Sequence, residues 1–148
     1  MRIALASDHA GFPLKQELAG WLGEQGHDII DLGTHSGDSV DYPEFGAKLA
    51  RAVGSGEAER GIAVCGSGIG ISIAVNRDPR CRCARVDDPL SAALAREHND
   101  ANVIALGARL IGPDMAKACV AAFLGTDFAG GRHQRRVDQL STLLEESD

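Results

Sequence analysis

The segment GIAVCGSGIGISIAV, residues 61–75, joins a buried strand to a helix within one short run. Residues 61–66 form a continuous apolar run, which is typical of a strand covered on both faces. Residues 69–75 carry the pattern that opens a helix, and glycines form the turn between the two. A strand joined by a short turn to a helix is the unit from which parallel α/β sheets are built. The segment therefore predicts an α/β fold.

The same alternation of strand and helix continues on both sides of this segment. Further apolar strands are predicted at residues 3–7, 28–33, 82–86 and 102–107. Helices are predicted at residues 13–23, 44–53, 113–124 and 134–146. A further helix is predicted to start at Pro89, with Asp88 as its cap. This pattern predicts a single domain, residues 1–148. Its expected architecture is a three-layer, Rossmann-like, doubly wound sheet of five parallel strands with an extra C-terminal helix.

The charge and composition of the chain disfavour several classes of function. The net charge is −6 and aromatic residues make up 4 % of the chain, which argues against nucleic-acid binding and base stacking. The sequence has no apolar run near the roughly 18 residues that a membrane span needs. Its first residues are typical of a strand rather than of a secretion signal, so we expect a cytoplasmic protein with no membrane partner.

The four cysteines are Cys65, Cys81, Cys83 and Cys119, and none forms a C-x-x-C pair. Reduced and mostly buried thiols are expected for such cysteines in the cytoplasm. Cys81 and Cys83 alternate along a predicted strand, and no histidine or second cysteine pair completes a zinc site at the usual spacing. We therefore predict no metal site.

Ligands of doubly wound sheets bind outside the carboxyl ends of the strands. The residues that follow each predicted strand therefore give the expected lining of the pocket. They are Asp8 and His9 after the first strand, Gly33, Thr34 and His35 after the second, the turn 65–70 after the third, Asp87 and Asp88 after the fourth, and Gly107 and Arg109 after the fifth. We expect these charged and reactive groups to converge in one cleft.

The glycine turn has two interpretations. It reads G-x-G-x-G, which falls short of the dinucleotide fingerprint, and no Walker lysine follows it. The glycines serve either close packing or a cradle of main-chain amides for an oxyanion at a helix N-terminus. Cys65 is correspondingly either a small buried hydrophobe or a thiol whose thiolate form the helix terminus favours. A cysteine phosphatase is disfavoured, because Ile71 and Ser72 stand where its arginine would be needed.

Two further groups of polar residues lie later in the chain. His98 ends a predicted helix, where its protonated form would be stabilised, and the alternative is a surface histidine. The segment GGRHQRRV, residues 130–137, holds three arginines in an acidic protein. Arg132 and Arg136 share a helix face if the helix begins early, whereas Arg135 points elsewhere. They form either a solvated helix start or a phosphate clamp that completes the site of a neighbouring subunit.

Taken together, these motifs resemble those of the type B ribose-5-phosphate isomerases and of the wider family that includes galactose-6-phosphate isomerase subunits. The resemblance covers nearly the whole chain. Its motifs, in family order, are SDHAGFPLK at 7–15, DLGT at 31–34, DYP at 41–43, CGSGIGISIAVN at 65–76, REHNDANVIALGAR at 96–109 and GGRHQRRV at 130–137. Cys65 is present and Val75 and Asn76 supply no carboxylate, so the chain resembles the branch that uses a cysteine as its base.

The resemblance implies a reaction and a role for each matching residue. The reaction is the interconversion of ribose 5-phosphate and ribulose 5-phosphate in the pentose phosphate pathway, through a cis-enediolate and with no cofactor or metal. In this interpretation His98 opens the sugar ring, Asp8 holds hydroxyls and Cys65 moves the proton between C2 and C1. The enediolate is stabilised by Ser67, by the amides of Gly66, Gly68, Ile69 and Gly70, and by Asn99. Tyr42 lines the pocket, and the phosphate is bound by His9, Arg109, Arg132 and Arg136.

The resemblance also implies a homodimer with shared active sites, alone or paired into a tetramer. Allose 6-phosphate and galactose 6-phosphate remain alternative substrates, because one extra carbon needs only modest changes of the pocket. A non-catalytic module that binds a nucleotide or a phosphosugar is the alternative from another functional class. The joint presence of Cys65, His98, Asp8 and Asn99 argues against it, since a binder needs the arginines but not a base.

Overall fold

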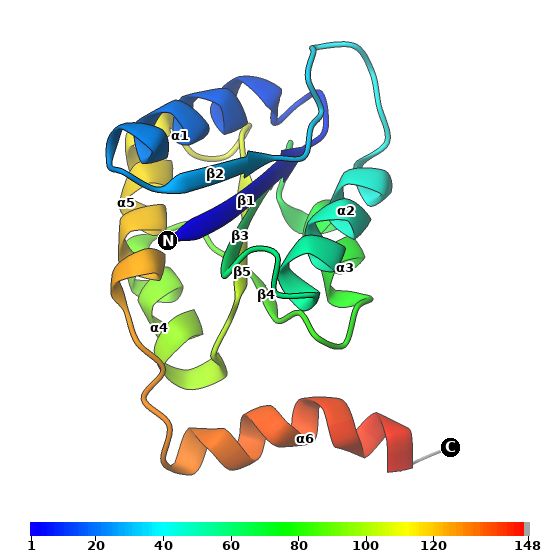
Figure 1. Cartoon of the computed structure of the whole chain (residues 1–148), viewed down its shortest axis with the longest axis vertical. Coiled ribbons are helices and arrows are strands. Elements are labelled where there is room, and N and C mark those ends of the chain that lie inside the picture. The colour runs from blue at the N-terminus through cyan, green and yellow to red at the C-terminus, as the bar shows by residue number, and fades with distance from the viewer. Residues whose placement is uncertain (147–148) are drawn as a thin grey trace.

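The computed structural model of the chain describes residues 1–146. Within them, strands and helices alternate as five β–α units followed by one further helix (Figure 1). In chain order they are β1 Arg2–Ser7, α1 Phe12–Glu24, β2 Asp28–Asp31, α2 Tyr42–Gly54, β3 Arg60–Cys65, α3 Ile69–Asn76, β4 Cys83–Arg85, α4 Pro89–Asn99, β5 Val103–Gly107, α5 Pro113–Gly125 and α6 Arg132–Glu146.

The boundaries follow the predictions closely and differ for local reasons. Asp88 caps α4 as expected, because its carboxylate accepts a hydrogen bond of 2.7 Å from the Ser91 amide. The second strand ends at Asp31 rather than at residue 33, since Gly33 takes a positive φ of 95° that turns the chain. The last helix begins at Arg132, which is the early start that places Arg132 and Arg136 on one face.

The five strands form one parallel sheet in the order β2-β1-β3-β5-β4. Strand β5 lies between β3 and β4, although β4 precedes it in the chain. The carboxyl ends of β1, β3 and β5 therefore lie side by side in the middle of the sheet. The predicted doubly wound α/β class is confirmed by this topology.

The two faces of the sheet carry side chains of different size. In β1, Ile3 and Leu5 join the core cluster of α1, α4 and α5, whereas Ala4 and Ala6 join the cluster of α2 and α3. Strands β3 and β5 alternate in the same way, with large residues mainly toward the first cluster. Small side chains let α2 and α3 approach the sheet closely. The N-terminus of α3 lies close to the end of β3, because only residues 66–68 separate the two elements.

Helix α6 lies apart from the sheet and contacts the rest of the chain mainly through α4 (Figure 1). Val137 is buried, but Leu140 and Leu143 are more than half exposed. These leucines of α6 are thus largely uncovered in a single chain. Within residues 1–146, no helix combines the length and the apolar character needed to cross a membrane.

Candidate active site

A cavity of about 330 Å³ lies at the carboxyl ends of β1, β3 and β5. It is lined by Asp8, Tyr42, Cys65, Gly66, Ser67, Gly70, Arg109 and Leu110. We call it the Cys65 cavity. All but Leu110 belong to the residues predicted from the sequence to bind or convert a substrate. The convergence predicted for the strand ends is therefore observed for β1, β3 and β5.

Cys65 is the last residue of β3 and its side chain is almost fully buried. Its sulfur accepts a hydrogen bond of 3.1 Å from the main-chain N–H of Gly68. Gly68 has a φ of 77°, and a Cβ atom there would lie 2.8 Å from the carbonyl carbon of Leu106. Only glycine fits that conformation and that space without strain. The turn thus aims one amide at the sulfur, and α3 begins at the next residue.

The turn 65–70 is tied to the loop that follows β5. The N–H of Ala108 donates to the Cys65 carbonyl at 2.9 Å, and that of Arg109 donates to the Gly66 carbonyl at 3.0 Å. The Arg109 guanidinium passes so close to Gly66 that a Cβ atom there would lie 3.2 Å from its Nη1. These contacts place a permanent positive charge at the cavity wall, beside the thiol.

Two amides of the predicted cradle already have partners inside the turn. The Gly68 N–H is bound to the sulfur, and the Ile69 N–H donates to the Ser67 hydroxyl at 3.1 Å. An enediolate oxygen that uses these two donors must therefore share them with Cys65 and Ser67 or displace them. The Gly68 amide can thus donate either to the Cys65 sulfur or to an anionic oxygen bound beside it.

Asp8 and His9 follow β1 and are fixed by main-chain contacts. Asp8 is buried, lines the Cys65 cavity and accepts a hydrogen bond of 3.0 Å from the Gly11 N–H. The Nδ1 atom of His9 lies 3.1 Å from the nitrogen and 3.2 Å from the oxygen of Val40. Val40 thus orients the ring and leaves Nε2 as the nitrogen that can meet a ligand. His9 is not among the residues that line the cavity.

His98 and Asn99 lie near the amino ends of the strands, whereas Cys65 lies at their carboxyl ends. Helix α4 starts where β4 ends and returns the chain to the start of β5, so its last residues lie at the amino ends of the strands. His98 and Asn99 therefore do not line the Cys65 cavity of their own chain, and the roles predicted for them stay predictions. The physical reason is that a helix between two parallel strands runs antiparallel to both.

Arg132 and Arg136 lie near His98 rather than near Cys65. The His98 ring stacks on His133 of α6 with a centroid distance of 4.4 Å and an interplanar angle of 15°. Desolvation, followed by the charges of His98, Arg132 and Arg136, lowers the pKa of His133. A basic group thus forms at the amino ends of the strands, and we call it the His98 group. It consists of His98, Asn99, Arg132, His133 and Arg136.

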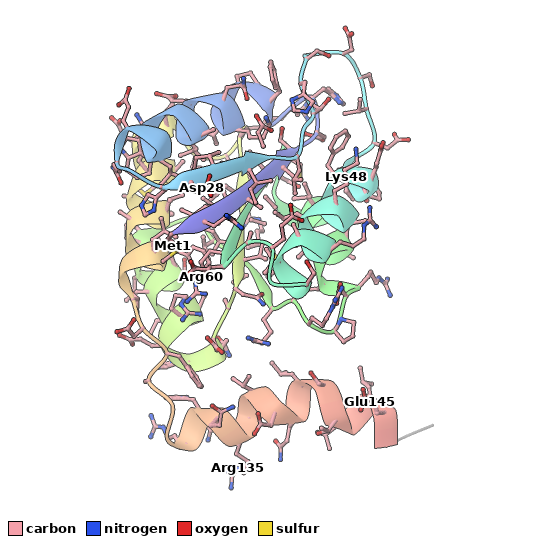
Figure 2. All side chains as sticks on the ribbon, in the orientation of Figure 1. Met1, Asp28, Lys48, Arg60, Arg135 and Glu145 are labelled. Atoms are coloured by element: carbon pink, nitrogen blue, oxygen red, sulfur yellow. The ribbon has the colours of Figure 1, made fainter. Side chains whose placement is uncertain are left out.

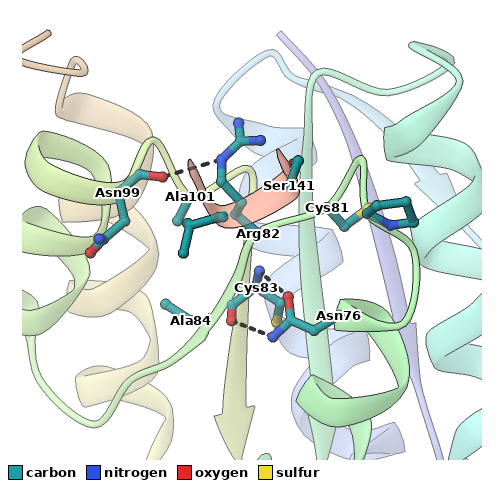
Figure 3. A pocket seen from close by; sticks show the side chains of 10 residues that line it. Asn76, Cys81, Arg82, Cys83, Ala84, Asn99, Ala101 and Ser141 are labelled. Atoms are coloured by element: carbon teal, nitrogen blue, oxygen red, sulfur yellow. Dashed lines mark hydrogen bonds between the residues drawn. The ribbon is translucent and has the colours of Figure 1, made fainter. Parts of the chain in front are cut away.

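A second cavity, of about 440 Å³, separates β4 and the segment before it from α6 (Figure 3). Its wall includes Asn76, whose side-chain amide is bound to both main-chain groups of Cys83, and Arg82, whose Nε lies 3.2 Å from the Asn99 carbonyl. Burial raises the pKa of the Cys81 thiol to about 11 and that of Cys83 further still. The thiols of this cavity are therefore protonated near neutral pH and offer no nucleophile.

The part of the chain from residue 1 to 146 contains no group of three or more His, Cys, Asp or Glu side chains able to hold a metal ion. The polar groups at the Cys65 cavity are a thiol, a carboxylate, a guanidinium, the hydroxyls of Tyr42 and Ser67, and main-chain amides. They can bind a polyhydroxylated anion and move a proton.

The model of the Ribose/Galactose Isomerase family matches residues 3–140. Ribose-5-phosphate isomerase B of Escherichia coli is 45 % identical over 142 residues, which cover 96 % of this chain and 95 % of that protein. The structure of Clostridium thermocellum ribose-5-phosphate isomerase B superposes with a TM-score of 0.97 at 47 % identity and covers the whole of both chains. The Mycoplasma genitalium enzyme, solved with bound ribulose-5-phosphate, superposes with a TM-score of 0.94 at 36 % identity, covering 98 % of this chain and 97 % of the other.

The chain belongs to the ribose/galactose isomerase family. The resemblance predicted from the sequence motifs is thereby confirmed over nearly the whole chain. In this member of the ribose/galactose isomerase family the predicted site residues fall into two groups. The Cys65 cavity holds Asp8, Tyr42, the glycine turn and Arg109, and the His98 group holds Asn99, Arg132 and Arg136.

Proposed function

We propose that the chain interconverts ribose 5-phosphate and ribulose 5-phosphate in a homodimer whose active sites are shared. In each site the Cys65 cavity of one subunit faces the His98 group of the other. The observation that carries the proposal is the Gly68 amide directed at a buried thiol beside Asp8 and Arg109. A phosphosugar binder would need the basic residues, but it would not need a thiol held in this way.

The proposed mechanism starts with ring opening. The partner's His98 transfers a proton between the ring oxygen and the anomeric hydroxyl, and Asp8 holds the sugar hydroxyls. Phosphate binding by His9 and Arg109, together with Arg132 and Arg136 from the partner, anchors the far end of the substrate. Binding energy from this remote group positions the reacting carbons over the thiolate.

The isomerisation step is a proton transfer between neighbouring carbons. The Cys65 thiolate removes the proton from C2 of the open aldose, and the electron pair forms a cis-enediolate whose charge rests on the carbonyl oxygen. The proton of the C2 hydroxyl passes to the C1 oxygen, which leaves the negative charge on the C2 oxygen. The same thiol then returns its proton to C1, so that the C2 oxygen becomes the carbonyl of the ketose and the thiolate is regenerated. As the sulfur gains the proton, its hold on the Gly68 N–H weakens while the oxyanion gains charge. Ser67, the amides of the turn and the partner's Asn99 are placed to stabilise that oxyanion.

A thiol base requires a reducing compartment, so the proposal includes the cytoplasm as the place of action. All four cysteines lie within the described residues and form no disulfide. The Cys65 sulfur accepts a hydrogen bond from a main-chain N–H of the glycine turn. Two copies suffice for a complete site, and pairing of dimers into tetramers would leave this chemistry unchanged.

The decisive test follows the reaction of ribose 5-phosphate with the purified chain in D₂O. We expect ketose formation with deuterium incorporation at C1. Cys65→Ala should lower kcat by at least about 1,000-fold, because it removes both the proton-transfer group and the acceptor to which the Gly68 amide donates. Cys81→Ala removes a thiol of the same size that stays protonated, and its kcat should match the wild type. Full activity of Cys65→Ala would reject the proposed base.

The substrate is tested by comparing kcat/KM for ribose 5-phosphate, allose 6-phosphate and galactose 6-phosphate. We expect the five-carbon substrate to give the highest value. A higher value for a six-carbon sugar would move the proposal to that substrate, and binding without turnover of any of the three would favour the non-catalytic module.

A further inference from the structure

Arg85, the last residue of β4, reaches the glycine turn from a strand that carries none of the predicted site residues. Its Nε donates a hydrogen bond of 2.9 Å to the main-chain carbonyl of Ser67. Its Nη1 pairs with Asp87 at 2.8 Å, which orients the guanidinium. The Arg85 side chain is three-quarters buried, and that of Asp87 is about half exposed. The contact with Ser67 is therefore made in a partly dry environment, where charge acts more strongly than in water.

The carbonyl that Arg85 binds belongs to the peptide unit between Ser67 and Gly68. The N–H of that same peptide unit is the group that donates to the Cys65 sulfur at 3.1 Å. A guanidinium, one peptide plane and the sulfur are thus connected by two consecutive hydrogen bonds. A charge on the carbonyl side polarises the peptide and strengthens the N–H donor on the other side. The donor in turn favours the sulfur in its anionic form.

We propose that Arg85 is a positioning residue that stabilises the Cys65 thiolate through the Ser67–Gly68 peptide. Its effect on catalysis rests on the proposed function, in which Cys65 is the base. Its effect on the thiolate does not, since it follows from the two hydrogen bonds. Arg85 also fixes the direction of the turn, because its bond to Ser67 holds the peptide plane whose other side faces the sulfur.

Other charged groups also face the cavity in which Cys65 lies. Asp8 at the end of β1 opposes a negative sulfur, whereas Arg109 beyond β5 favours it, and Tyr42 at the start of α2 completes the titratable lining. Asp87 partly neutralises Arg85. Arg85 differs from Arg109 in acting through a directed donor to the sulfur. Removal of Arg85 should therefore shift the pH midpoint of Cys65 alkylation, even though Asp8 and Arg109 stay in place.

The test measures the pH midpoint of Cys65 alkylation by iodoacetamide on the full chain, read from the mass of the peptide that contains Cys65. Arg85→Met should raise the midpoint by about 0.5 to 1 pH unit, as expected for loss of one partly screened charge. Arg85→Lys, which keeps a charge near the carbonyl, should restore part of that shift. Arg60→Met is the control: Arg60 begins the strand that Cys65 ends, and it should leave the midpoint unchanged (Figure 2).

An unchanged midpoint in Arg85→Met would overturn the proposal, whatever happens to activity. If that variant does not fold, Arg85→Gln takes its place with the same expected rise and the same contradicting result. In the isomerase assay, the acid limb of kcat should move to higher pH by the same amount, with KM nearly constant. A fall in kcat without a shift of this limb would mean that Arg85 only supports the loop. Full activity of Cys65→Ala would reject Cys65 as the base and leave the proposal for Arg85 standing. The alkylation midpoint reports the two hydrogen bonds from Arg85 to the sulfur independently of activity.

Discussion

The Cys65 cavity and the His98 group are built in different ways. The first is assembled from buried strand ends, and its turn is held by main-chain bonds from the residues that follow β5. The second lies on the end of α4 and the start of α6, and α6 shows half-exposed leucines along its length. The cavity therefore owes its geometry to the core, whereas the His98 group depends on a helix that a single chain leaves largely uncovered. Changes in the first should damage both stability and chemistry, and changes in the second should alter binding with the fold intact.

Gly68→Ala should produce the largest effect, because it acts on the region built into the core. Alanine at a φ of 77° and against the Leu106 carbonyl should lower the free energy of unfolding by about 1–3 kcal/mol. The misdirected amide should also lower kcat by about 100-fold or more. Chemical denaturation and steady-state kinetics measure the two effects.

Gly20→Ala provides the matched control for that substitution. Gly20 lies within α1, and a Cβ atom there meets no other atom within 4 Å. This change should stabilise the chain by up to about 1 kcal/mol and leave kcat unchanged. A Gly68→Ala protein as stable and as active as Gly20→Ala would show that the turn does not need its left-handed residue.

Arg136→Ala should affect the His98 group without affecting the fold. Loss of a charge-assisted bond to phosphate should raise KM by about 10- to 100-fold, with a much smaller change in kcat and in Tm. Arg135→Ala is the control, since Arg135 points away from the rest of the chain (Figure 2). If the two variants have the same KM, Arg136 does not bind the phosphate.

The smallest effect concerns the pH response of the same group. Desolvation, followed by the charges of His98, Arg132 and Arg136, should place the pKa of His133 below its ordinary value of 6.5. The unfolded chain then binds this proton more readily than the folded chain does. The free energy of unfolding should therefore decrease as the pH falls from 6.5 through the lowered pKa of His133. An NMR titration of the imidazole should give a lowered midpoint that rises toward 6.5 in Arg136→Ala. A midpoint unaffected by Arg136 would place that arginine away from the histidine pair.

Much of this arrangement could be predicted from the sequence. The apolar run and glycines of residues 61–75 predict where β3 ends and α3 begins, and hence that Cys65 lies at a strand end facing a helix terminus. Asp88 and Pro89 likewise predict the start of α4. These features are local, so the residue pattern is enough to specify them.

The sequence places His98 at the end of the helix that Asp88 and Pro89 start, and the structure confirms this position in the last turn of α4. The residues after His98 lead directly into β5, which places the histidine at the amino end of that strand. The contact of Arg85 with Ser67 carried no such signal. It depends on the position of β4 beside β5 at the edge of the sheet, and strand order arises from packing across the whole domain.

Each proposed active site combines the Cys65 cavity of one subunit with the His98 group of another. Mixing Cys65→Ala chains with Arg136→Ala chains, both nearly inactive at low substrate concentration, tests this arrangement directly. In a hybrid dimer one site receives both lesions and the other receives neither. Random pairing in equal amounts should therefore restore about a quarter of the wild-type activity. Mixed dimers that regain no activity would contradict the shared site and place Arg136 in the same site as Cys65 of its own chain.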